Sequence, residues 1–396
     1  MDLRRQLAVV ALVYVIEGFP MGAYSSVFGF YFASQHVALA SIGLLGSLRL
    51  AWSFKVVWSP IVERFGTRQQ WIAGALIVMA GAFAAFAWLP PDPIGAALWT
   101  ALGVYCAASA TQDIAIDAYT IGLVDRANLG PANAVRTAAY RVGMLASSTG
   151  LLLLPDRIGW DAAFLAGAAL SLLLAAGLAV TPPISLPPAA ERRPVEALLR
   201  WIKRPGAPWV IAFVLLFRIG DSAMGPMIAP FWHQRGINAA EYGTFAGFLG
   251  ALLFVAGGVA AGAWMARAGM VRALWVTGAL ALVSNLGYAA VAEWPESGKL
   301  AVYAAGAIES ATSGAVGAAF VAFLMSICDP RYAAVEYALV SSLYAAAGAM
   351  LAGASGWITE AVGYAGYFAL TAAFAAPAFA FLSRAARWLE PAAEEN

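Results

Sequence analysis

Two carboxylates and an amide stand inside an otherwise apolar stretch of the chain. Gln112, Asp113 and Asp117 lie within residues 95–124. On a helix, Asp113 and Asp117 are one turn apart and share a face. A charge at the centre of a bilayer costs about 2.5–3.5 kcal/mol on insertion scales. The pair therefore needs cationic partners, a water-filled cavity or a bound proton, and because two acids this close do not both ionise easily, it is a candidate proton site.

Further ionisable residues lie deep in apolar stretches. Glu17 joins Asp113 and Asp117 as a third candidate for proton coupling. Arginine in such a place can hold a carboxylate or phosphate group with two parallel hydrogen bonds. The candidate solute-binding residues are Arg49, Gln112, Arg141, Arg218, Asp221 and Glu309. The alternative interpretation is structural pairing between neighbouring helices, for example of Asp113 with Arg141.

Three charged residues fall closer to the ends of the apolar stretches. Lys55, Arg136 and Glu336 lie within a turn or two of a predicted boundary. Long charged side chains near helix ends can extend to the membrane interface. This interfacial position would explain all three residues without a function.

The composition places these groups in a membrane protein. The chain is 62% hydrophobic and 11% charged, with a mean hydropathy of +0.76, whereas soluble domains carry about 25% charged residues. Such an excess of apolar side chains predicts several membrane spans. The net charge of +1 excludes a general nucleic-acid binder. We expect no metal site and no cofactor, since Cys106 and Cys328 are far apart and the two histidines form no ligand cluster.

Twelve apolar stretches are long enough to span a bilayer, which predicts an all-α membrane protein with twelve transmembrane helices. The first contains Glu17 and Pro20 and lacks a clear cleavage site, so we interpret it as a retained span rather than a signal peptide. The stretches are 7–33, 41–61, 70–89, 95–124, 133–154, 160–181, 208–233, 241–264, 272–292, 300–327, 333–354 and 362–383.

The basic residues predict the orientation of these spans. With the N-terminus inside, the outer loops hold only Arg157, Arg235 and Lys299. The inner segments hold Arg4, Arg5, Arg64, Arg68, Arg126, Arg192, Arg193, Arg200, Lys203, Arg204, Arg267, Arg272, Arg331, Arg384 and Arg387. Because basic residues accumulate on the cytoplasmic side, both termini are predicted to be cytoplasmic.

The longest polar gap divides the chain into two halves. Residues 182–207 are Pro-rich and basic, which predicts a cytoplasmic linker between six-helix bundles at 1–181 and 208–396. The halves resemble each other weakly, since Ser41-Ile42-Gly43 and Glu241-Tyr242-Gly243 open corresponding spans. A repeat of this kind is typical of transporters with a binding site between two bundles. The corresponding loops suggest a cytoplasmic gate formed by Glu63, Arg64, Arg68, Arg267 and Arg272.

Six short motifs cover nearly the whole chain, at residues 54–64, 111–118, 140–144, 217–221, 319–325 and 337–341. They resemble the motifs of the AmpG-like permeases, the peptide/acetyl-coenzyme A transporter branch of the major facilitators. The resemblance implies two six-helix halves around a central cavity. It also implies proton-driven uptake of GlcNAc–anhydromuropeptides through the inner membrane. Glu63 stands where the family usually has Asp, and Arg218 stands where Lys is expected.

Other activities remain as alternatives. The same branch of the family contains siderophore and acetyl-coenzyme A carriers. A receptor or sensor with a carrier fold is an alternative of another class, and an intramembrane aspartyl protease would need Asp113 to face an acid such as Asp221. We expect a monomeric secondary transporter that is not an enzyme, with protons, a small solute and the lipid bilayer as its partners.

Overall fold

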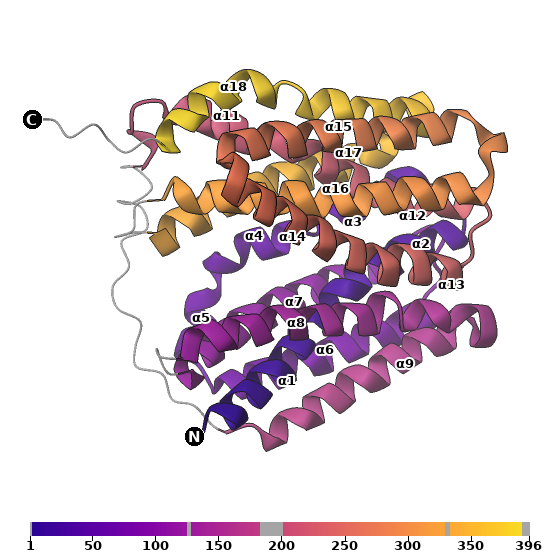
Figure 1. Ribbon diagram of the computed structural model, residues 1–396. Coiled ribbons are helices and arrows are strands. Elements are labelled where there is room, and N and C mark those ends of the chain that lie inside the picture. Colours follow the sequence, from indigo (N-terminus) through magenta and orange to yellow (C-terminus); the bar gives the residue numbers. More distant parts are fainter. Residues whose placement is uncertain (1, 125–127, 183–200, 329–332, 390–396) are drawn as a thin grey trace, which may run out of the picture. The chain divides into compact units, whose positions relative to one another are not determined.

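The computed structural model describes residues 2–124, 128–182, 201–328 and 333–389. Every regular element in these ranges is a helix (Figure 1). Most of the predicted linker, at 183–200, lies outside the described residues, as do Arg126 and Arg331. By packing, the chain divides into two compact units. The first comprises residues 1–42, 48–189 and 236–248, and the second comprises residues 43–47, 190–235 and 249–396.

The first unit begins with a long helical stretch that contains a proline and a π-helical turn. Its elements are α1 (Leu3–Gly22), η1 (Ala23–Val27), α2 (Phe28–Ser34), α3 (Leu39–Ser47, of which only 39–42 belong here), α4 (Leu50–Phe54), η2 (Lys55–Val57), α5 (Ser59–Arg64), α6 (Arg68–Trp88), α7 (Ala96–Leu123), α8 (Leu129–Ser148), η4 (Leu151–Leu153), α9 (Pro155–Gly177) and η5 (Leu178–Val180). Helix α13 (Ala239–Tyr242) and most of η6 (Gly243–Leu249) also group with it.

The second unit consists mainly of long helices. They are α11 (Ala207–Phe217), α12 (Ile219–Gln234), α14 (Gly250–Ala268), α15 (Met270–Glu293), η7 (Pro295–Ser297), α16 (Gly298–Ser326), α17 (Ala333–Ala375), α18 (Ala378–Ala385) and η8 (Ala386–Leu389). Helix α17 is interrupted at Gly363, whose φ of 72° is accessible to glycine at low cost. The break falls at the second residue of the last predicted span, 362–383.

Each unit has its own aromatic core. In the first unit, the ring of Phe28 packs edge-on against Phe86 and Tyr105, with centroids 4.9 and 5.0 Å away. In the second unit, the ring centroid of Phe213 lies 4.8 Å from that of Phe217 and 5.0 Å from that of Phe323. Edge-to-face and tilted ring pairs of this kind add to the burial of apolar area. They fix the long helices that carry the polar side chains.

Eight helical stretches in the described part of the chain are long and apolar enough to cross a membrane. Helices α7 and α8 are not among them, although each is at least 20 residues long. Helix α7 contains Gln112, Asp113 and Asp117, and α8 contains Arg136 and Arg141. Both of these long helices therefore carry ionisable residues within an otherwise apolar stretch.

Two of the predicted spans have a break that carries a basic residue. The predicted span at 41–61 is divided into α3, α4, η2 and α5, with Lys55 in the 3-10 turn η2. The predicted span at 208–233 is divided at Arg218, which separates α11 from α12 with φ −111° and ψ 9°. A break in a helix changes the direction in which nearby side chains point. The breaks at Lys55 and Arg218 therefore help to set the orientation of these two basic side chains.

Candidate functional site

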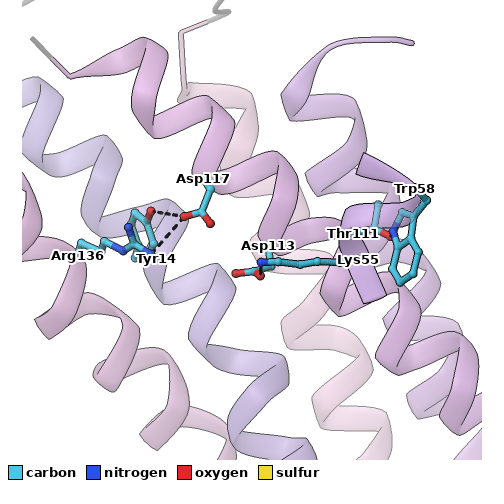
Figure 2. Close-up of polar contacts among 7 residues, drawn as sticks. All are labelled: Tyr14, Lys55, Trp58, Thr111, Asp113, Asp117 and Arg136. Atoms are coloured by element: carbon cyan, nitrogen blue, oxygen red, sulfur yellow. Dashed lines mark hydrogen bonds and ion pairs between the residues drawn. The ribbon is translucent and has the colours of Figure 1, made fainter. Parts of the chain in front are cut away.

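Asp113 forms an ion pair with Lys55. The ammonium group of Lys55 contacts the carboxylate from η2, and the two side chains are 31% and 17% exposed (Figure 2). Three residues further along, Trp58 donates its indole N–H to Thr111 Oγ1 at 3.1 Å. The segment from η2 to α5 is thus fixed to α7 at two points, and this attachment orients Lys55 toward Asp113.

Asp117 lies one turn further along α7 and has different partners. Its Oδ1 accepts a hydrogen bond from the Tyr14 hydroxyl at 3.1 Å and lies 3.2 Å from Arg136 Nη2 (Figure 2). The guanidinium carbon of Arg136 lies 4.7 Å from the centre of the Tyr14 ring, within the range of a cation–π contact. Asp117 therefore connects α7 to α1 and α8 at once.

Glu17 projects from α1 toward the same place. It lies within hydrogen-bonding distance of Asp113, and its Oε2 is buried with no hydrogen-bond partner in the described part of the chain. Next to it, the fully buried Gln112 donates from Nε2 to the Ile16 carbonyl at 3.3 Å. Gln112 was predicted to bind the solute. In the structure its amide joins α7 to α1 directly beside Glu17.

Small residues allow α1 to lie along α8. A Cβ added at Gly18 would overlap the backbone carbonyl of Tyr140, and one added at Gly143 would overlap the carbonyl of Val15. The two backbones therefore touch where glycine stands on either helix. This close approach fixes α1 against α8, while the hydrogen bonds of Gln112 and Asp117 join the same helix to α7.

A second polar cluster lies in the second unit. Arg218 Nη2 is 3.5 Å from Asp221 Oδ2, and these side chains are 19% and 15% exposed. The same nitrogen donates to Ser313 Oγ on α16 at 3.4 Å. Glu309, one turn before Ser313, lies close enough to interact electrostatically with Asp221 and Arg218. Arg218, Asp221 and Glu309 were all predicted from sequence, and the structure brings them together.

Room for the Arg218 guanidinium comes from a glycine. A Cβ added at Gly317 would lie 3.4 Å from Arg218 Nη1. Gly317 is one turn after Ser313 on α16, so this face of the helix offers first a hydroxyl and then an open space. A Cβ at this distance makes an ordinary van der Waals contact, so only a side chain longer than that of alanine at 317 would compete with the guanidinium for this space.

The remaining predicted residues have separate surroundings. Arg49 is exposed at the break between α3 and α4, and its backbone lies within hydrogen-bonding distance of the side chain of Tyr24. Arg141 is half-buried on α8 next to Tyr140.

The residues of the predicted cytoplasmic gate make local contacts. The guanidinium group of Arg68 donates to the Val62 carbonyl, and that of Arg64 lies 6.0 Å from the centre of the Phe65 ring. Arg267 and Arg272 are exposed on either side of Gly269. The side chain of Glu63 lies outside the described part of the chain.

The interfacial interpretation of Lys55, Arg136 and Glu336 missed their partners. Lys55 and Arg136 pair with the two aspartates, and Glu336 is fully buried, 3.9 Å from Arg204 Nη1. Tyr14 was missed altogether. A signal existed for it, since Tyr14 precedes Glu17 by three residues and so shares its helix face. Lys55 could have been predicted as a partner, because a buried Asp113 requires a nearby cation.

A family model for the Major Facilitator Superfamily matches residues 10–352. The chain belongs to this superfamily. It is 30% identical over 392 residues to the anhydromuropeptide permease of Escherichia coli (strain K12), with 95% of this chain and 78% of that protein covered. It is also 25% identical to a putative transporter, AmpG 4, of Rickettsia felis, over 95% of each chain. The resemblance to AmpG-like permeases is confirmed, and the protein is a membrane transporter of this group.

Solved structures support the same fold. A bacterial homologue of the human lysosomal transporter Spinster, in an inward-facing and unoccupied conformation, aligns with a TM-score of 0.77 over 98% of this chain and 99% of its own, at 16% identity. The nucleoside transporter NupG aligns with a TM-score of 0.73 at 14% identity, over 97% of this chain and 99% of its own. At such identities the likeness concerns the fold alone.

Proposed function

We propose that this protein imports anhydromuropeptides across the inner membrane together with protons. The observation that carries the proposal is its 30% identity to the E. coli anhydromuropeptide permease over 95% of the chain. The two clusters of ionisable side chains agree with a polar, partly anionic solute and with proton coupling. A sugar peptide offers carboxylate, hydroxyl and amide groups, which arginine, serine and carboxylate side chains recognise.

We propose the same arrangement of spans that the sequence predicts. Twelve spans form six-helix bundles at 1–181 and 208–396, joined by a cytoplasmic linker at 182–207, around a central cavity. Both termini lie in the cytoplasm, and the protein works as a monomer. The charged loops at 63–68 and 267–272 act as a cytoplasmic gate that opens when the bundles rock.

Each cluster has a proposed role. Asp113, Asp117 and Glu17 hold the coupling proton. Arg49, Arg141 and Arg218 attract anionic groups of the solute, while Gln112, Asp221 and Glu309 complete the polar surface of the cavity. Alternating access exposes these groups first to the outside and then to the cytoplasm, as in other rocking carriers.

Uptake into energised membrane vesicles tests the proposal. Vesicles containing the protein should accumulate radiolabelled GlcNAc–anhydroMurNAc peptide, and collapsing the proton gradient should abolish accumulation. Each 100 mV of membrane potential adds about 2.3 kcal/mol per charge moved. Unlabelled ferric siderophore and acetyl-coenzyme A serve as competitors. If either displaces the peptide, or if uptake is unchanged without a gradient, the substrate or the coupling proposed here is wrong.

The Asp113→Asn variant separates a carrier from a receptor. The substitution keeps the shape of the side chain but removes the charge that pairs with Lys55. We expect accumulation to fall at least tenfold, with Glu296→Gln, an exposed residue of η7, as the matched control. A receptor would instead bind the peptide normally in both forms without accumulating it.

A further inference from the structure

The position of Glu17 distinguishes it from the other two acids of the first unit. Asp113 and Asp117 each contact a cation, Lys55 and Arg136 respectively. Glu17 lies instead within hydrogen-bonding distance of the Asp113 carboxyl group, and its Oε2 is buried with no partner among the described residues. The three acids therefore have three different kinds of neighbour.

These neighbours determine which acids are charged. A carboxylate is stabilised by a cation at ion-pair distance and by hydrogen bonds that it accepts. Asp113 has the Lys55 ammonium group, and Asp117 has both the Arg136 guanidinium group and the Tyr14 hydroxyl. Each of the two cations already serves a carboxylate. Asp113 and Asp117 are accordingly the members of the cluster whose charged forms have stabilising partners in the structure.

Two carboxyl groups form a hydrogen bond only when one of them carries a hydrogen. Because Asp113 is held as a carboxylate by Lys55, the donor in its contact with Glu17 is Glu17. We propose that Glu17 is the residue that carries the exchangeable proton, and that Asp113 accepts its hydrogen bond. This inference rests on the proposed function and narrows it from three acids to one.

Several charged and polar groups surround Glu17, so loss of its proton changes the electrostatic balance of the whole cluster. They are Tyr14 on α1, Lys55 on η2, Asp113 and Asp117 on α7, and Arg136 and Tyr140 on α8. Deprotonation places a third negative charge beside two carboxylates that share two cations. At low dielectric this arrangement is unfavourable, so release of the proton favours a rearrangement of the Lys55–Asp113 pair. Reprotonation restores the arrangement described here.

Infrared spectroscopy of the purified full-length protein at neutral pH tests the assignment without any transport. A protonated carboxyl group has a carbonyl stretch separate from that of a carboxylate. We expect Glu17→Gln to remove one such band, while Glu296→Gln, at an exposed glutamate, leaves the spectrum unchanged. Lys55→Met should strengthen the protonated signal, because Asp113 then loses its cation. If the Glu17→Gln spectrum keeps the full band, the assignment is wrong.

Transport supplies the second measurement. Glu17→Gln imitates the protonated state, so exchange of labelled for unlabelled GlcNAc–anhydroMurNAc peptide should persist without a gradient. Uptake driven by an imposed pH gradient should fall at least tenfold. A variant that still couples uptake to the gradient like the unsubstituted protein would overturn the proposal. If the unsubstituted protein shows no gradient-driven uptake, the proposed function fails, while the infrared result still decides whether Glu17 holds a proton.

Discussion

The contact between Lys55 and Asp113 changes how the role of both residues is interpreted. Taken separately, one is a basic side chain near a predicted span end and the other an acid inside a span. In the structure they form one ion pair between η2 and α7, and both side chains are mostly buried. A buried pair adds little to stability as a whole, but removal of one member leaves the other charge uncompensated.

A double-mutant cycle measures this pairing. We expect Lys55→Met and Asp113→Asn each to destabilise the protein, and the double variant to be less destabilised than their sum. The coupling free energy should be about 0.5–3 kcal/mol, obtained from unfolding in mixed detergent micelles. Lys203→Met, at an exposed lysine, is the matched control. Strict additivity of the two substitutions would contradict the pairing.

At the level of helices, glycines decide how close α1 and α8 come. The backbone of α8 occupies the space that a side chain at Gly18 would need, whereas nothing lies within 4 Å of a Cβ built at Gly103 on α7. The same arrangement recurs in the second unit, where a Cβ at Gly257 would overlap the Ala311 carbonyl. Small residues at helix interfaces are general in membranes. What distinguishes Gly18 is that Glu17 precedes it.

Gly18→Ala should therefore affect both packing and function. Overpacking of a tight contact costs about 1–3 kcal/mol, since α1 and α8 must separate. Gly103→Ala should be neutral or gain up to about 1 kcal/mol, because alanine favours helix. Thermal unfolding in detergent compares the two variants. Equal melting temperatures would show that α1 and α8 do not touch at Gly18.

For the whole molecule, the distribution of basic residues predicts which ends of the helices face the cytoplasm. Glu296 in η7 and Lys203 before α11 are both exposed, and they lie on opposite sides of the membrane in the predicted orientation. The two natural cysteines, Cys106 and Cys328, are buried. A background in which both are replaced by alanine therefore permits labelling at a single introduced cysteine.

Cysteine labelling tests the predicted orientation. An impermeant maleimide applied to intact spheroplasts should label Glu296→Cys and should leave Lys203→Cys unlabelled until the membrane is permeabilised. The reason is the positive-inside rule, which places the basic segments in the cytoplasm. The reverse pattern of labelling would invert the topology and, with it, the proposed direction of transport.

The sequence by itself determined the class of protein and identified the candidate functional residues. Composition required a membrane protein, and short motifs identified AmpG-like permeases, which the comparison with known proteins confirmed. The depth of Glu17, Asp113 and Arg218 in apolar stretches marked them as special, because a buried charge is costly wherever the helix lies. These conclusions depend on local patterns, which a sequence displays directly.

Only the tertiary structure decided the partners. Lys55 and Asp113 are 58 residues apart, and Gln112 and Ile16 are 96 apart, so their contacts depend on how helices rotate and where they break. Helical periodicity indicates which residues share a face, but it does not indicate which helix that face meets. The 3-10 turn at η2 and the glycine contacts between α1 and α8 set those rotations. Backbone packing, rather than residue type, therefore assigned each acid its neighbour.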